Sequence, residues 1–79
     1  MRFPSKEQVE RVRLAYPNGT RVELVAMCDP YTTLKLGTLG TVDFVDSTGT
    51  VFCVWDDGSI LGAVYGVDVI RCVDEGDVL

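Results

Sequence analysis

The chain has 79 residues, 47% of them hydrophobic, and a net charge of −5. A chain of this length supports a single domain over residues 1–79 with a small core. Its acidity argues against nucleic acid as the main partner, because neutralisation of phosphates by Lys and Arg supplies most of that affinity. Histidine is absent and the three cysteines form no C-x-x-C pair, so we expect no zinc site. Asp43, Asp46, Asp56 and Asp57 could offer oxygen ligands to a hard cation, but their spacing matches no known loop, and we expect no metal and no cofactor.

The charge is unevenly distributed along the chain. Residues 1–14 carry four basic and two acidic side chains, whereas residues 41–79 carry one basic and eight acidic side chains. No segment has the apolar length of a signal peptide or a membrane span. An odd, scattered set of cysteines is typical of reduced thiols. We therefore expect a cytoplasmic protein without membrane association, in which Cys53 and Cys72 are buried as small apolar side chains.

Residues 4–16 predict one short helix. Ser5 is a good N-cap, and Gln8 three residues later completes a capping box. The segment 17–19, Pro-Asn-Gly, then ends the helix and reverses the chain. The apolar face of this helix, which is wide enough to pack on a sheet, is formed by Val9, Val12 and Tyr16.

The rest of the chain predicts five β-strands. The first, over residues 20–27, alternates in polarity and places Val22 and Leu24 toward the core. In the loop that follows, residues 28–37, Leu34 and Leu36 are expected to pack inward, and the chain turns tightly around Gly37 and Gly40. The remaining strands are predicted at residues 42–45, 51–55, 60–65 and 69–73, with hairpin glycines at Gly49 and Gly58 and a frayed acidic tail at 74–79.

Alternation along the strands predicts which side chains form the core. In the third strand we place Val51, Cys53 and Trp55 inward. In the second strand Val42 and Phe44 share one face. The centre of the core is predicted to hold Val22, Val42, Cys53 and Val64.

Phe52 and Val54 then point outward, although both are apolar. Three interpretations remain open at this point. The N-terminal helix covers these side chains, they form a dimer or partner surface, or they are ordinary surface scatter.

The order of a helix, a strand, a long loop, three consecutive strands, a turn and a final strand predicts a mainly β fold. We expect a small SH3-like barrel of about five antiparallel strands over residues 20–73, with one short N-terminal α-helix at 4–16. The G-x-x-G-x-V segment at Gly37, Gly40 and Val42 resembles the KOW type of such barrels.

Six further segments carry a more specific likeness. They are R-F-P-S-K-E-Q-V-E-R from Arg2, P-N-G-T-R-V-E-L from Pro17, D-P-Y-T from Asp29, G-T-L-G-T-V from Gly37, W-D-D-G-S from Trp55 and Y-G-V-D from Tyr65. Through them the chain, from Met1 to about Arg71, resembles the bacterial and phage domain-of-unknown-function family 4314. The resemblance implies a cytosolic protein of a bacterium, phage or mobile element, and it carries no established activity.

Aromatic side chains are the strongest candidates for a functional site. Tyr31 in the long loop, Trp55 at the end of the third strand and Tyr65 after the fourth are predicted to line a groove for an extended peptide. For Trp55 the alternative is packing in the core. Phe52 and Val54 form the alternative partner surface.

Other functions remain as alternatives. The acidic half would suit an inhibitor that mimics the charge of nucleic acid. Catalysis is not expected, because no histidine is present to act as a general base. We therefore expect a non-enzymatic interaction module with a protein partner, or alternatively a homodimer. A nucleic-acid-binding accessory domain, the further alternative, would use Arg2, Lys6, Arg11, Arg13, Arg21 and Lys35.

Overall fold

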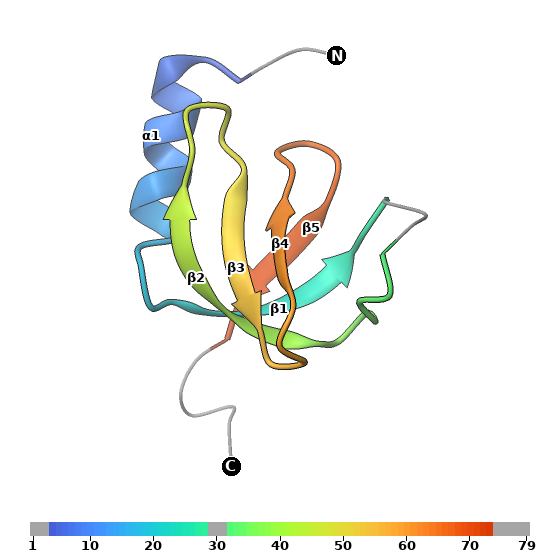
Figure 1. Cartoon of the computed structure of the whole chain (residues 1–79). Helices are drawn as coiled ribbons and strands as arrows, with labels where there is room; N and C mark the ends of the chain where they lie inside the picture. Colours follow the sequence, from blue (N-terminus) through green and yellow to red (C-terminus); the bar gives the residue numbers. More distant parts are fainter. Residues whose placement is uncertain (1–3, 29–31, 74–79) are drawn as a thin grey trace.

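A computed structural model describes residues 4–28 and 32–73 of the chain. The strands form one antiparallel sheet in the order β4-β3-β2-β1-β5, which curves around the core and carries α1 beside β2 (Figure 1). The predicted mainly β fold, with five antiparallel strands and one short helix, is confirmed. The elements in chain order are α1 (Lys6–Ala15), β1 (Arg21–Ala26), β2 (Leu39–Val45), β3 (Val51–Trp55), β4 (Ile60–Ala63) and β5 (Val69–Cys72).

The sheet is open where a closed barrel was expected. β4 and β5 are its two edges, and within the described residues they do not pair with each other. The side chain of Asp68 links segments that lie near the two edges. It accepts hydrogen bonds from the N–H of Cys28 (3.0 Å) and from the N–H of Val64 (2.9 Å). A carboxylate therefore ties the residues after β1 to the turn between β4 and β5.

Two hairpins of the same geometry connect β2 to β3 and β3 to β4. In the first, the N–H of Gly49 donates to the carbonyl of Asp46 (3.1 Å), and in the second the N–H of Gly58 donates to the carbonyl of Trp55 (2.9 Å). Both glycines have positive φ angles, 82° and 93°, a conformation that side chains disfavour. Three-residue loops that contain a residue of positive φ are common hairpin connections, so the predicted hairpin glycines are confirmed in this role.

The core lies inside the curved sheet. The inward positions predicted in β1 and β3 are confirmed, and so is the packing of Leu34 under the long loop. Leu36, by contrast, is 65% exposed, and Cys72 is exposed as well, so both of these predictions were wrong. The buried hydrophobic side chains are Val9, Val22, Leu24, Leu34, Val42, Val45, Val51, Cys53, Trp55 and Ala63.

A β-bulge changes the side-chain alternation in β2. The pairing with β3 shifts between Val42 and Phe44, so Val42 and Val45 both face the core while Phe44 lies on the outer side, 51% exposed. The prediction that Phe44 shares the face of Val42 was wrong. A bulge inserts one residue into one strand, here Asp43, and thereby inverts the alternation beyond it.

The alternation in β4 is also the opposite of the predicted one. Ala63 is buried opposite Val51, whereas Val64 lies beyond the end of the strand and is only half-buried. Val64 is therefore not at the centre of the core, and that prediction was wrong. Gly62, paired with Phe52, faces outward.

Gly40 belongs to β2 and not to the turn predicted there. It pairs with Val22 on one side and with Trp55 on the other. A Cβ atom at this position would lie 2.6 Å from Cε3 of Trp55, so the indole occupies the space of the missing side chain. The indole N–H donates to the carbonyl of Leu61 in β4 (3.1 Å). One buried side chain thus connects β2, β3 and β4.

The helix has the predicted capping box. The N–H of Gln8 donates to Oγ of Ser5 (3.2 Å), and the N–H of Ser5 donates to Oε1 of Gln8 (2.8 Å). Val9 is buried, and Val12 and Tyr16 pack against the core, which confirms the apolar face. Within the described residues no helix has the length and hydropathy needed to cross a membrane.

Gly40→Ala should destabilise the protein by about 1–3 kcal/mol, because the added methyl group must displace the indole of Trp55 in a packed core. Urea unfolding followed by tryptophan fluorescence measures the free energy of unfolding. The control is Val25→Ala, at a position of β1 that is 44% exposed, where we expect a change within about 0.5 kcal/mol. Equal stabilities of the two variants would contradict the close contact at Gly40.

Cys53 should be the last of the three thiols to react. Burial raises the pKa of its thiol to about 11, whereas Cys28 and Cys72 are exposed, and the thiolate is the reactive form. Maleimide labelling at neutral pH, read by mass spectrometry, should modify Cys53 only after unfolding. In the folded protein the pKa of Cys53 is raised above 9.0. The contribution of its neutral thiol to the free energy of unfolding is therefore complete below that pH and is lost as the pH rises toward 11. Rapid labelling of all three thiols in the native protein would refute the buried position.

Candidate functional site

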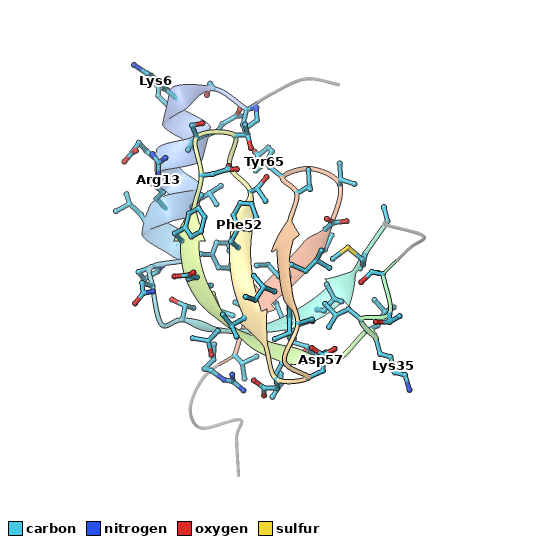
Figure 2. The ribbon with its side chains drawn as sticks, in the orientation of Figure 1. Lys6, Arg13, Lys35, Phe52, Asp57 and Tyr65 are labelled. Carbon is cyan, nitrogen blue, oxygen red and sulfur yellow. The ribbon has the colours of Figure 1, made fainter. Side chains whose placement is uncertain are left out.

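The outer side of β2, β3 and β4, which faces away from the core, carries a group of apolar side chains. They come from three neighbouring strands and form one surface, here called the outer apolar surface. Phe44 is 51% exposed, Val54 44% and Ile60 72%, while Phe52 is half-buried. Figure 2 shows Phe52 on the front of the sheet, beside α1 and not beneath it. The outer apolar surface consists of Phe44, Phe52, Val54 and Ile60.

Stacking of two aromatic rings orders one half of this surface. The centroids of Phe44 and Phe52 are 4.8 Å apart and their planes are inclined by 14°. Phe52 also pairs with Gly62 across β3 and β4, and a Cβ atom on Gly62 would lie 3.1 Å from Cε1 of Phe52 and 2.6 Å from Cγ2 of Thr50. The ring therefore extends over β4 at the one position that has no side chain. Such an aromatic pair contributes about 0.5–1.5 kcal/mol beyond its burial.

The other half of the surface ends at an ion pair. Val54 pairs with Ile60 on one side and with Thr41 on the other, and Arg21 follows on β1. The guanidinium of Arg21 donates to Oγ1 of Thr41 (2.9 Å) and to both carboxylate oxygens of Asp56 (2.8 and 2.7 Å). The hydrogen bond from Arg21 holds the pKa of Asp56 below its ordinary value. The outer apolar surface is thus bordered on the β1 side by the ion pair of Arg21 and Asp56.

Two further carboxylates shape the hairpin turns. Oδ1 of Asp57 accepts from the N–H (2.9 Å) and the hydroxyl (2.6 Å) of Ser59, and these bonds lower the pKa of Asp57. For Asp46, burial raises the pKa, but hydrogen bonds from Thr48 and Thr50 outweigh it and leave the pKa lowered. Both groups therefore stay ionised at neutral pH. No cluster of three or more potential metal ligands occurs among residues 4–28 and 32–73.

The structure does not bring Trp55 and Tyr65 together into the predicted groove. Trp55 is 1% exposed, so the alternative interpretation, packing in the core, is confirmed for it. Tyr65 is 40% exposed and follows the strand end at which Ala63 pairs with Val51, whereas Trp55 adjoins the turn at the other end. Tyr31 lies outside the described residues.

Tyr65 instead lines a small cleft between α1 and the turn after β4. Val12, Tyr16 and Ile70 contribute to its walls, and its volume is ≈ 190 Å³. Sites for drug-sized ligands usually have roughly 300–1,000 Å³. The cleft therefore has room for one or two side chains.

The helix does not cover the outer apolar surface, so the first of the three interpretations of Phe52 and Val54 was wrong. Nε of Arg13 donates to the carbonyl of Val45 (3.3 Å) and the hydroxyl of Tyr16 donates to the carbonyl of Ile70 (3.4 Å). α1 thus spans from β2 to β5 across one end of the core. Its single apolar face is used there and cannot also cover the opposite side of the sheet.

The basic side chains do not gather on one face of the described structure. Lys6 and Arg13 lie on α1, whereas Lys35 lies on the other side of the molecule (Figure 2). Arg13 and Arg21 are each paired with a carboxylate, which reduces their availability to phosphate. The other two predicted nucleic-acid contacts are Arg11, exposed on α1, and Arg2, which lies outside the described residues.

Sequence reasoning missed two members of the outer apolar surface. The position of Phe44 depends on the bulge at Asp43, for which a single acidic residue in an apolar strand is only a weak signal. Ile60 was accessible to sequence reasoning. A three-residue loop ending at Gly58 makes Trp55 and Ser59 a pair, so that Ile60 falls opposite Val54 on the outer side.

Comparison with known proteins identifies one similarity. A family model described as "Domain of unknown function (DUF4314)" matches residues 5–73, a range that includes the whole helix and all five strands. No curated protein and no solved structure matches the chain.

Arg21→Gln should raise the titration midpoint of Asp56. In the unsubstituted protein we expect that midpoint below the ordinary value of 3.8, so the stabilisation is present at neutral pH and is lost as the pH falls through the lowered pKa. NMR detection of the carboxyl carbon over an acid titration measures it. Arg11→Gln, on the exposed side of α1, is the control and should leave the titration midpoint of Asp56 unchanged. An unaltered midpoint in Arg21→Gln would show that the pair is absent in solution.

Proposed function

The chain belongs to the domain-of-unknown-function family DUF4314, and from this premise, which names no activity, we propose that it is a non-enzymatic module that binds a protein partner through the outer apolar surface. The observation that carries the proposal is the group of four apolar side chains on β2–β4 that α1 leaves uncovered. The resemblance to bacterial and phage proteins, together with the reduced thiols, supports a location in the cytoplasm. The cell would be a bacterium or one that carries the phage or mobile element.

The grouping of these side chains supports a binding role over ordinary surface scatter. Single exposed apolar side chains are normal in soluble proteins, whereas contiguous groups mark interaction sites. Phe44 and Phe52 stack, and Val54 and Ile60 adjoin them in the next row. The surface lies on strands whose main chains are paired, so a partner would order little of it on binding, and that lowers the entropic cost of association.

The composition of the surface favours a protein over nucleic acid or a small ligand. Aromatic and aliphatic side chains at the centre with charges at the border are the arrangement of protein interfaces. The adjoining carboxylates of Asp56 and Asp57 would repel phosphate. The strand order, in which β5 returns to pair with β1 after three consecutive strands, supports our further proposal that the fold is an open relative of SH3-like barrels.

Val54→Asp should abolish partner binding and leave the fold intact. Val54 adjoins Phe52 and Ile60 in the surface, and replacing its apolar contact by a carboxylate that must be desolvated on binding is costly, so we expect affinity to fall at least about ten-fold. Leu14→Asp is the matched control, because Leu14 is 80% exposed on α1, away from this surface. Capture from extracts of the source cell, with chemical crosslinking and quantitative mass spectrometry, compares the two variants with the unsubstituted chain.

The expected result is one set of crosslinked proteins that is retained by Leu14→Asp and lost by Val54→Asp. Circular dichroism of both variants verifies that they fold. Capture that is equal for the two variants would overturn the proposed role of this surface. A dimer of the chain itself, dispersed by Val54→Asp in sedimentation, would make a second copy the partner.

A further inference from the structure

Among the residues that the structure describes, β4 is an edge strand with one unpaired edge, and this edge is contiguous with the outer apolar surface. Building on the proposed function, we propose that an extended segment of a basic partner protein adds to the edge of β4 as a further strand. Apolar and polar side chains alternate along this partner segment. When the segment is bound, one of its Lys or Arg residues lies near Asp57.

The hairpin shows which main-chain groups of β4 face away from β3. The N–H of Trp55 donates to the carbonyl of Ser59 (2.8 Å), so the main chain of Ser59 faces β3. Because these groups alternate between the two sides of an antiparallel strand, those of Ile60 and Gly62 face outward and those of Leu61 face β3. The bond from the Trp55 indole to the carbonyl of Leu61 agrees with this direction. Two N–H and two C=O groups are thus oriented toward an added strand.

The two edges of the sheet differ in their protection. Edge strands of soluble proteins are commonly blunted by charged side chains, proline or bulges. β4 reads Ile-Leu-Gly-Ala and has none of these. β5 carries Arg71, which pairs with Glu23, and its pairing with β1 shifts register near Val69. The comparison favours β4 as the pairing edge.

Side chains beside this edge can supply the remaining affinity. β4 has four residues, so main-chain bonds alone support only weak binding. Ile60 is 72% exposed and continues the outer row that begins with Val54. At Gly62 there is no side chain between the edge and the ring of Phe52. Alternate apolar side chains of an added strand would fall beside these groups.

The charge around β4 indicates the chemistry of the partner. Residues 56–68 include three aspartates and no Lys or Arg. Asp56 is paired with Arg21, which leaves Asp57 at the start of β4 and Asp68 beyond its end. A basic segment complements these charges. Antiparallel pairing of two copies would instead place the Asp57 end of one β4 beside the Asp68 end of the other, so like charges oppose a homodimer.

The test uses the whole 79-residue chain and random linear peptides displayed on beads, from which binders are selected, sequenced and synthesised. We expect selected peptides that alternate in polarity, contain Lys or Arg, and bind more weakly as salt is raised. Ile60→Pro removes an outward N–H and should bind about ten-fold more weakly than Ile60→Val, which keeps the N–H and a β-branched apolar side chain at the same position. Asp57→Asn, which keeps an acceptor for Ser59, should reduce both affinity and salt dependence.

A measurement on the unsubstituted protein complements the variants, because proline in β4 can also lower stability. Amide hydrogen exchange at Ile60 and Gly62 should slow when a selected peptide binds. No slowing, or equal binding to Ile60→Pro and Ile60→Val, would overturn strand addition. If Val54→Asp still abolished binding in that case, the proposed surface would stand and only this inference would fail. Failure to select any peptide, or a dimer that Ile60→Pro disperses, would also overturn it.

Discussion

The contact between the Trp55 indole and Gly40 is the constraint on which the arrangement of β2, β3 and β4 depends. The ring lies where a side chain of Gly40 would be, at 2.6 Å from the position of its Cβ, and its N–H reaches the carbonyl of Leu61. Packing between β2 and β3 and a hydrogen bond to β4 therefore come from the same buried side chain. With the indole inside, Val54 and Ile60 necessarily lie outside, because neighbouring residues of a strand face opposite sides.

The exposed surface follows from having one helix for a sheet that is apolar on both sides. β3 has apolar residues at all five positions, so whichever side faces the core, the other remains apolar. α1 places its only apolar face on the end of the core between β2 and β5. The outer apolar surface is thus a consequence of composition and topology together, and stacking of Phe44 on Phe52 partly shields it from water.

Charge and topology support the proposed binding mode independently. The acidic residues near β4 either shape a turn, as Asp57 does, or hold a main-chain group, as Asp68 does. These structural roles leave their negative charge in place beside an edge strand that carries no charge of its own. A basic extended segment complements both the main-chain groups and the charges at this edge.

Local patterns in the sequence determined the capped helix, the three-residue hairpins with Gly49 and Gly58, and the strands of the sheet, because these depend on residues close in the chain. Tertiary structure alone decided the face of Phe44, the side of the sheet that α1 covers, and whether the sheet closes. Each of these depends on contacts between residues of different elements: the shifted pairing of β2 with β3 at Asp43, the packing of Val9 on the core, and the hydrogen bond from Cys28 to Asp68. A period of two residues shows that a strand has two faces, but the space available against its neighbours decides which face is buried.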